Sequence, residues 1–291
     1  MHGADRIIDA VLRHGTPLCL GLDPRWELLP EEVRQRYGQT EWGRARAYEE
    51  FCCRCLDIAQ GHLGIVKVQS AFFEALGPEG MTVLRYIIQG ARRRGFFVIL
   101  DAKRGDIPST GEAYAEAVYR IYGADAVTVS PLFGRESLVP FVTMMERRGG
   151  ALFVLVRTSN IGARDYQDLE CGGRKLCECI AEDVEQWARQ TRGMSGFGAV
   201  GAVVGAVEAE MLVRLRALMP TALFLIPGYG AQGGRAELLR GAFVEPGKGA
   251  IVNAARSILY AAPAGERCWE IYVEKALLAA KRELALAAGL E

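Results

Sequence analysis

The sequence predicts an α/β fold, a (β/α)8 barrel that forms one domain over residues 1–291. Apolar, β-branched runs alternate with amphipathic stretches from one end of the chain to the other, and they make eight β–α units in a row. The composition does not change along the chain, and no linker, repeat or low-complexity segment divides it. This regularity favours a closed barrel over a doubly wound sheet. A six-stranded open sheet with an appended subdomain is the alternative.

Each strand is predicted from a short apolar run that ends in polar or turn-forming residues. In chain order the predicted strands are Leu18–Asp23, Ile65–Gln69, Phe96–Lys103, Ala126–Pro131, Leu152–Ser159, Ala199–Gly205, Leu223–Gly228 and Ala250–Ala254. Between them, apolar residues at helical spacing predict the helices Arg44–Gln60, Thr82–Arg94, Gly111–Tyr122, Glu136–Arg147, Lys175–Gln190 and Glu208–Leu218. An N-terminal helix lies between His2 and His14, and a long helix from Glu266 to Ala288 closes the chain.

The bulk properties of the chain exclude several classes of partner. Half of the residues are hydrophobic, and 35 acidic residues balance 35 basic ones. A net charge of zero gives no reason to expect nucleic acid or a membrane surface as partner. The first residues contain no apolar signal region, and no apolar run approaches the length of a membrane span. We therefore expect a cytoplasmic protein.

The cysteines and histidines do not indicate a metal site or a catalytic histidine. The eight cysteines, at positions 19, 52, 53, 55, 171, 177, 179 and 268, show no paired C-x-x-C spacing. The chain is also too long for a disulfide scaffold, so we expect free, buried or half-buried thiols. His2 and His14 flank the first helix and His62 precedes a strand, away from the strand ends where chemistry is expected.

The end of the third predicted strand is the most informative segment. Asp101 and Lys103 lie two residues apart, so on an extended strand their side chains point to the same side. Asp106 follows after Gly105, which lets the chain bend. Two carboxylates and an ammonium at one strand end are costly to desolvate unless they serve a function. A structural ion pair is the alternative, but the arrangement suits a lysine that is held charged and aimed as a proton donor.

Other strand ends carry polar groups as well. They include Asp23 after the first strand, Lys67 and Gln69 in the second, Thr158-Ser159-Asn160 after the fifth, and Asn253-Ala254-Ala255-Arg256-Ser257 at the eighth. The chain has only six lysines, and two of them fall at adjacent strand ends. Singly, these residues could form turns or helix caps. Together they predict a site at the C-terminal face of the barrel, where barrel enzymes carry their chemistry.

A glycine-rich segment follows the seventh predicted strand. Its Gly228-x-Gly230-x-x-Gly233 spacing matches the dinucleotide fingerprint, but that fingerprint should open the first βαβ unit. The loops after strands seven and eight of a barrel often form a phosphate site instead. Here the Gln232 amide, the Arg256 guanidinium and backbone amides could hold a phosphate dianion. A plain glycine-rich turn is the alternative.

These residues resemble the orotidine 5′-phosphate decarboxylase family. The pattern Asp101-x-Lys103-x-x-Asp106, with Ile107 and Thr110, is similar to the family's signature. The resemblance extends through LCLGLDP, VKVQSAFFEALGPEG, ILDAKRGDIPSTGEAYA, VTVSPLFG, VRTSN, PGYGAQGG and NAARSILYA, and it is closest to the longer bacterial subfamily. One departure is Ile161, where the family pattern has a proline after the Ser-Asn pair.

The resemblance implies a homodimeric barrel, without cofactor or metal, that converts orotidine 5′-phosphate to uridine 5′-phosphate and carbon dioxide in pyrimidine biosynthesis. It implies that Lys103 protonates C6 of the pyrimidine, that Asp101 lies beside the substrate carboxylate, and that Asp106 reaches into the neighbouring subunit's site. The substrate-binding residues that it implies are Asp23, Lys67, Asp106 and Thr110 at the ribose, Ser159 at the pyrimidine amide edge, Gln232 and Arg256 at the phosphate, and Ile107 and Gly233 beside them.

Three other functions stay open at this stage. A magnesium-dependent 3-keto-L-gulonate 6-phosphate decarboxylase shares the Asp-x-Lys-x-x-Asp pattern, but it needs an acidic residue where this chain has Lys67. A Schiff-base aldolase would need a neutral lysine, whereas flanking carboxylates favour the ammonium form. A non-catalytic phosphate-binding barrel is compatible with the fold, but it has little use for an Asp-Lys-Asp array.

Overall fold

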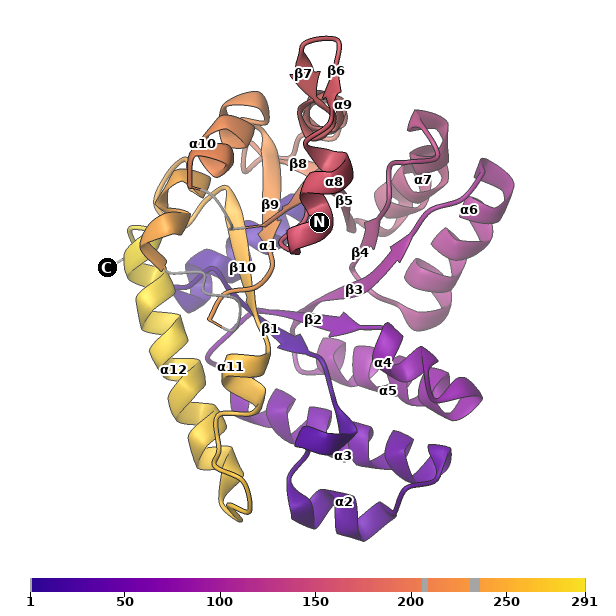
Figure 1. Ribbon diagram of the computed structural model, residues 1–291, viewed down its shortest axis with the longest axis vertical. Coiled ribbons are helices and arrows are strands. Elements are labelled where there is room, and N and C mark those ends of the chain that lie inside the picture. Colours follow the sequence, from indigo (N-terminus) through magenta and orange to yellow (C-terminus); the bar gives the residue numbers. More distant parts are fainter. Residues whose placement is uncertain (1, 206–208, 231–235, 291) are drawn as a thin grey trace.

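The computed structural model describes residues 2–205, 209–230 and 236–290, and its eight parallel strands close into a barrel (Figure 1). The barrel strands are β1 (Leu18–Leu22), β2 (Ile65–Gln69), β3 (Phe97–Arg104), β4 (Ala126–Val129), β5 (Ala151–Arg157), β8 (Gly198–Val204), β9 (Ala222–Ile226) and β10 (Ala250–Ala254). Each pairs with the next along the chain, and β10 pairs with β1 to close the ring. The predicted fold class is confirmed, and every predicted strand is present with its ends within two residues.

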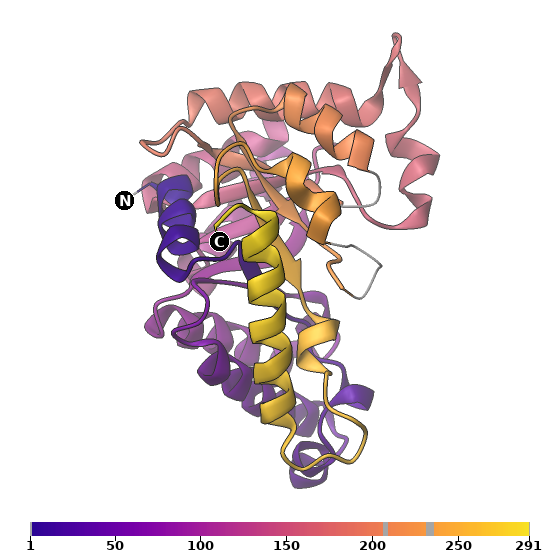
Figure 2. The ribbon, with the colours of Figure 1, turned by 90° about the vertical axis from the view of Figure 1, so that its left-hand side faces the viewer.

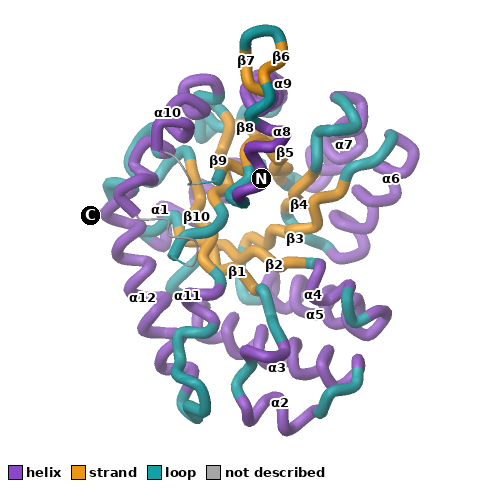
Figure 3. Tube along the Cα trace, viewed as in Figure 1, coloured by secondary structure: helices purple, strands orange, loops and turns teal. Residues whose placement is uncertain are grey.

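Helices surround the ring of strands (Figure 3). They are α1 (Gly3–His14), α2 (Glu31–Tyr37), α3 (Glu41–Ala59), α4 (Ala71–Glu74), α5 (Gly77–Arg93), α6 (Pro108–Glu116), α7 (Val139–Arg148), α8 (Arg164–Gln167), α9 (Leu176–Gln190), α10 (Ala209–Leu218), α11 (Arg256–Leu259) and α12 (Trp269–Ala287). None of the helices in the described part of the chain is long and apolar enough to cross a membrane.

Both faces of the barrel sheet are buried, as is typical of parallel strands covered by helices. One apolar cluster fills the space between strands and outer helices, and a second fills the barrel interior. Helix α1 closes the lower end of the barrel, because Ile7 and Val11 join the interior cluster. Gly3 lets α1 approach this closely: a Cβ there would lie 1.7 Å from the carbonyl oxygen of Gly150. The interior is therefore packed from below, and a cavity can open only toward the C-terminal ends of the strands.

A buried arginine joins the lower ends of β9 and β10 to α10. The Arg216 guanidinium donates hydrogen bonds to the carbonyl oxygens of Met219 (2.7 Å), Ala222 (2.8 Å), Gly249 (2.7 Å) and Ala242 (3.0 Å). Burial lowers the pKa of Arg216 to about 9, so the group is still charged at neutral pH. One side chain thus donates hydrogen bonds to four carbonyls, of which Gly249 also has a backbone donor.

Several helix predictions are corrected by the structure. Between β9 and β10, where the sequence predicts no helix, the described residues form a 3-10 helix, η5 (Ala236–Ala242). The helix predicted from Gly111 begins at Pro108, since proline fits the first turn of a helix, and its last part, Ala117–Tyr122, is a π-helix. The last helix begins at Trp269 instead of Glu266. Glu208, the predicted start of another helix, lies outside the described residues.

A hairpin between β5 and α9 was not predicted. Its strands, β6 (Glu170–Cys171) and β7 (Arg174–Lys175), are antiparallel, and Figure 2 shows the hairpin extending outward from the rest of the chain. Gly172 and Gly173 form its turn, both with positive φ (60° and 78°). Two adjacent glycines with positive φ are typical of the two-residue turns of hairpins. The Gly-Gly pair was the signal for it in the sequence.

Candidate active site

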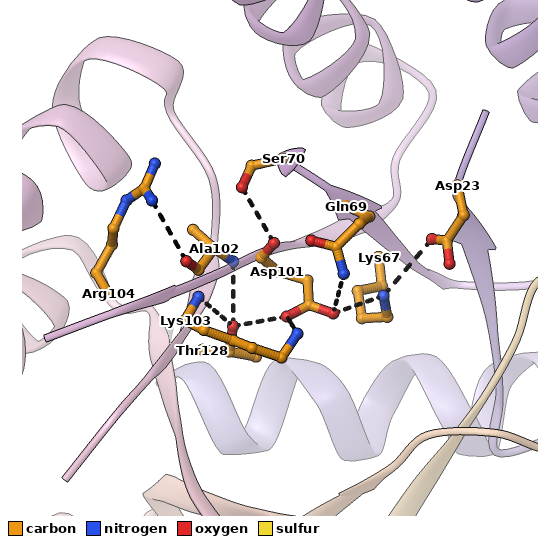
Figure 4. A network of polar contacts seen from close by, with 9 residues as sticks. All are labelled: Asp23, Lys67, Gln69, Ser70, Asp101, Ala102, Lys103, Arg104 and Thr128. Atoms are coloured by element: carbon orange, nitrogen blue, oxygen red, sulfur yellow. Dashed lines mark hydrogen bonds and ion pairs between the residues drawn. The ribbon is translucent and has the colours of Figure 1, made fainter. Parts of the chain in front are cut away.

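Four charged residues at the ends of β1, β2 and β3 form one network at the C-terminal end of the barrel (Figure 4). Lys67 Nζ lies 2.9 Å from Asp101 Oδ2, and Lys103 Nζ lies 2.6 Å from Asp101 Oδ1. Lys67 Nζ is also 3.7 Å from Asp23 Oδ1. The Gln69 amide donates a further hydrogen bond to Asp101 at 3.0 Å. Asp101 is thus the centre of the network, with an ammonium group on each oxygen.

Thr128 on β4 fixes both Asp101 and the backbone that follows it. Its hydroxyl donates to Asp101 Oδ1 at 2.8 Å and accepts from the backbone N–H groups of Ala102 (3.1 Å) and Lys103 (3.0 Å). Lys103 has a φ of 47°, the only positive value at a non-glycine residue in the described part of the chain. Such a conformation is strained and persists only where the surroundings hold it. Thr128 was not among the predicted site residues.

Lys67 and Asp101 form a buried ion pair. Burial disfavours the charged form of each side chain, but the attraction of the neighbouring opposite charges is the larger effect. The side chains of Lys67 and Asp101 are 4% and 10% exposed. Despite burial, the charges of Asp101 and Asp23 raise the pKa of Lys67 above its usual range. Despite burial, Lys67 and Lys103 hold the pKa of Asp101 well below its usual range. Both groups are therefore charged at neutral pH. The Lys103 side chain, 46% exposed, is the more accessible of the two lysines.

A cavity of about 380 Å³ opens above this network. Six predicted site residues line it: Asp23, Lys67, Asp101, Lys103, Ser159 and Arg256. Its other walls include Gln69, Thr128, Thr158, Asn160, Tyr229 and Asn253. The volume suits a small-molecule ligand. The cavity is charged on the β1–β3 side, neutral and polar at the end of β5, and basic at Arg256.

The loop after β5 is held by a partly buried ion pair. The Arg157 guanidinium contacts both carboxylate oxygens of Asp168, each at 3.2 Å. Gln167 accepts a hydrogen bond from the backbone N–H of Thr158 at 2.8 Å. Ser159 packs directly on Gly205, where a Cβ would lie 2.8 Å from the Ser159 Cα. These contacts fix the position of Ser159 at the cavity wall.

Three predicted site residues lie away from this cavity in the single chain. Asp106, Ile107 and Thr110 are not among the residues that line it. Asp106 Oδ1 accepts a hydrogen bond from the backbone N–H of Ile107 at 2.8 Å, and the Ile107 side chain is 57% exposed. Two further predicted residues, Gln232 and Gly233, lie outside the described residues.

Side chains that could bind a metal ion are not clustered in the described part of the chain. Over residues 2–205, 209–230 and 236–290, no three His, Cys, Asp or Glu side chains are grouped so that they could hold a metal ion. The eight cysteines are free thiols. Cys19, Cys52 and Cys55 are fully buried, and burial raises the pKa of each thiol. These cysteines are therefore in the unreactive protonated form.

The fold and this site define a class of (β/α)8-barrel enzymes whose chemistry is built from lysine and aspartate at the strand ends. Comparison with known proteins identifies the family. The model of the orotidine 5′-phosphate decarboxylase / HUMPS family matches residues 16–271, and the chain belongs to that family. The predicted family is thus confirmed, and with it the prediction of a member of a decarboxylase family.

Individual relatives agree with this assignment. The chain is 44% identical to the orotidine 5′-phosphate decarboxylase of Rhodopirellula baltica, over 89% of this chain and 88% of that protein. It is 40% identical to the protein of the same name from Deinococcus radiodurans, over 89% of both chains. Among solved structures, the OMP decarboxylase of Leishmania donovani matches with a TM-score of 0.80 and 33% identity, over 99% of both chains.

Proposed function

We propose that this chain converts orotidine 5′-phosphate to uridine 5′-phosphate and carbon dioxide, the activity that the names of its relatives state for those proteins. The observation that carries the proposal is the Lys67–Asp101–Lys103 array in the cavity. A buried carboxylate bonded to two ammonium groups presents fixed charge at the position where a carbanion would form. A barrel that only binds a phosphate ligand has no use for this array.

Lys103 acts in this proposal as the proton donor. Loss of carbon dioxide breaks the bond from C6 to the carboxyl carbon and leaves the electron pair on C6. No electron sink adjoins that carbon, so positioned positive charge must stabilise the pair. The Lys103 ammonium transfers a proton to C6 and regains one from solvent. Its contact with Asp101, 2.6 Å away, and its backbone contact with Thr128 hold it in place before the substrate binds.

The remaining cavity residues would position the nucleotide. Asp23 and Lys67 bind ribose hydroxyls, Ser159 meets the amide edge of the pyrimidine, and Arg256 binds the phosphate. Gln232 and Gly233 belong to the same phosphate site in this proposal. Phosphate binding is remote from the bond that breaks, yet its energy can be used to close the site and orient the reacting carbon.

We also propose a homodimer in which Asp106 of one protomer completes the partner's site. Asp106, Ile107 and Thr110 lie outside the cavity of their own chain, between the end of β3 and the first turn of α6. Beside them on the loop after β4, Leu132 and Phe133 are 76% and 51% exposed. Exposed apolar side chains on neighbouring loops are typical of an interaction surface. Phe133→Asp should convert the dimer to monomers in analytical ultracentrifugation; unchanged sedimentation would contradict this interface.

Three broader features complete the proposal. Residues 1–291 form one domain, with α1 below the barrel and α12 along its side. The enzyme acts in the cytoplasm, and it needs neither a cofactor nor a metal. The magnesium-dependent alternative is disfavoured because the Lys67 ammonium, 2.9 Å from Asp101, occupies the place where a divalent cation would need an oxygen ligand.

The test is a spectrophotometric assay of the EDTA-treated protein with orotidine 5′-phosphate, run beside Lys103→Ala. We expect rapid turnover by the wild type, none by the variant, and uridine 5′-phosphate affinity nearly unchanged in the variant. A variant that retains more than a small fraction of wild-type kcat would contradict the role of Lys103. An inactive wild type that decarboxylates 3-keto-L-gulonate 6-phosphate with magnesium would favour the metal-dependent alternative, and one that only binds uridine 5′-phosphate would favour a binding protein.

A further inference from the structure

Asn253 is a buried polar residue that the proposed function leaves without a role. It lies on β10, is 6% exposed, and lines the cavity. Its Oδ1 atom is buried and has no hydrogen-bond partner among the residues that the structure describes. Buried amides are nearly always hydrogen-bonded in proteins, and an unpaired one costs free energy of folding. An amide that lines a cavity in this state is a candidate for a ligand contact.

The neighbouring strand is adapted to this side chain. A Cβ at Gly21 of β1 would lie 2.9 Å from Asn253 Oδ1, 3.1 Å from its Nδ2 and 2.8 Å from the Ala255 Cβ. No larger residue at position 21 leaves room for the amide in its present place. Gly21 has an ordinary backbone conformation, outside the group of positive-φ glycines, so this close approach is the reason for glycine here.

The surroundings of Asn253 indicate which ligand group it would meet. Gly21 pairs in register with Lys67 on β2, and Asp23 follows directly after the end of β1. Asp23 Oδ1 is likewise buried without a hydrogen-bond donor, 3.7 Å from Lys67 Nζ. Arg256 lies three residues beyond Asn253. The amide thus lines the same cavity as the residues proposed for the ribose and the one proposed for the phosphate.

We infer that Asn253 is a specificity-determining residue that binds a ribose hydroxyl of the nucleotide; this inference rests on the proposed function. A phosphate oxygen is only an acceptor, so it cannot satisfy the unpaired carbonyl oxygen of the amide. A hydroxyl can donate to Oδ1 and accept from Nδ2. Asn253 therefore joins Asp23 and Lys67 in recognising a ribonucleotide over its deoxy analogue.

The test measures the affinities of uridine 5′-phosphate and its 2′-deoxy and 3′-deoxy analogues by calorimetry. The variants are Asn253→Leu, which has a similar shape without the amide, and Asn253→Ala, in case leucine is not accommodated. The matched control is Asn160→Leu, at the end of β5, which also lines the cavity. Thermal unfolding shows that each variant is folded.

We expect both Asn253 variants to bind uridine 5′-phosphate about 3- to 10-fold more weakly, the effect of losing one hydrogen bond between neutral groups. The affinity for one of the two deoxy analogues should not change. Any effect of the Asn160 variant should be the same for all three ligands. Equal losses for all three ligands with the Asn253 variants, or no loss, would overturn the inference alone. A wild type that does not bind uridine 5′-phosphate would overturn the proposed function and this inference with it.

Discussion

Replacement of Asp101 by asparagine is the most direct test of the charged network. The substitution keeps the shape of the side chain and removes the charge between Lys67 and Lys103. Lys67 is 4% exposed and, among the residues that the structure describes, would keep only Asp23, 3.7 Å away, as a carboxylate neighbour. Breaking a buried ion pair by removing one partner costs about 3–5 kcal/mol, because the other charge stays buried and uncompensated. Since Asp23 offsets part of this, we expect the free energy of unfolding at pH 7 to fall by about 3 kcal/mol.

The measurement is chemical denaturation of the wild type and of Asp101→Asn. Equal slopes of the free energy of unfolding against denaturant concentration show that both proteins expose the same surface when they unfold. Lys103→Ala is the matched control. Its ammonium contacts the other oxygen of Asp101, but its side chain is 46% exposed, so solvent screening limits the loss to less than about 1 kcal/mol. Lys103→Ala should thus abolish turnover while the free energy of unfolding stays nearly unchanged. Asp101→Asn should lower both turnover and the free energy of unfolding. If Asp101→Asn unfolded within about 1 kcal/mol of the wild type, the reasoning from the buried pair would be wrong.

Three further predictions follow from the described contacts. Thr128→Val leaves the N–H groups of Ala102 and Lys103 without their acceptor, so kcat should fall at least about 10-fold and stability by about 1–3 kcal/mol, measured by steady-state kinetics and thermal unfolding. Arg216→Met removes a donor from four buried carbonyls, of which Gly249 keeps a backbone donor, and should lower the free energy of unfolding by about 3 kcal/mol or more, with kcat at 25 °C unchanged. Because the folded-state pKa of Asp101 is lowered, its contribution to stability is present above about pH 4 and is lost as the pH falls further; the Asp101→Asn variant should show a shallower acid dependence.

The fold could be predicted almost completely from the sequence, because a parallel barrel repeats one local pattern. Each strand is an apolar run bounded by turn residues, and β2 and β10 match their predicted limits at both ends. The errors fall where the local pattern is ambiguous. The π-helical turn in Ala117–Tyr122 has the apolar spacing of an α-helix, and only its hydrogen bonds distinguish it. The 3-10 helix in Ala236–Ala242 was not predicted.

The site could be predicted in part, because charge in an apolar strand is conspicuous whereas threonine is not. Asp101, Lys103 and Lys67 could be identified because charged residues are rarely buried without a partner. Thr128 could not, since a β-branched residue is common in any strand; its position in the Val127-Thr128-Val129 run was the only signal. The role that we propose for Asp106 needs a second chain, which no pattern within one sequence defines.

The strained backbone at Lys103 determines where its charged side chain lies in the site. The register between β3 and β4 shifts between Leu100 and Arg104, and Lys103 lies within that irregularity with its positive φ. Bulges of this kind redirect a side chain next to active sites. In a regular strand, Asp101 and Lys103 would extend side by side, about 6–7 Å apart along the strand; here the ammonium turns back to within 2.6 Å of the carboxylate.

Holding this conformation costs about 1–3 kcal/mol, and the Thr128 hydroxyl offsets it by accepting two consecutive backbone N–H groups. The ammonium is therefore fixed by β3 and β4 themselves and not by a loop that must first close. A charged group that stabilises only the transition state accelerates a reaction most when it is already in position, because no free energy is then needed to move it. The strained strand end supplies that condition for the proton transfer that we propose for Lys103, and it accounts for a residue other than glycine in this conformation.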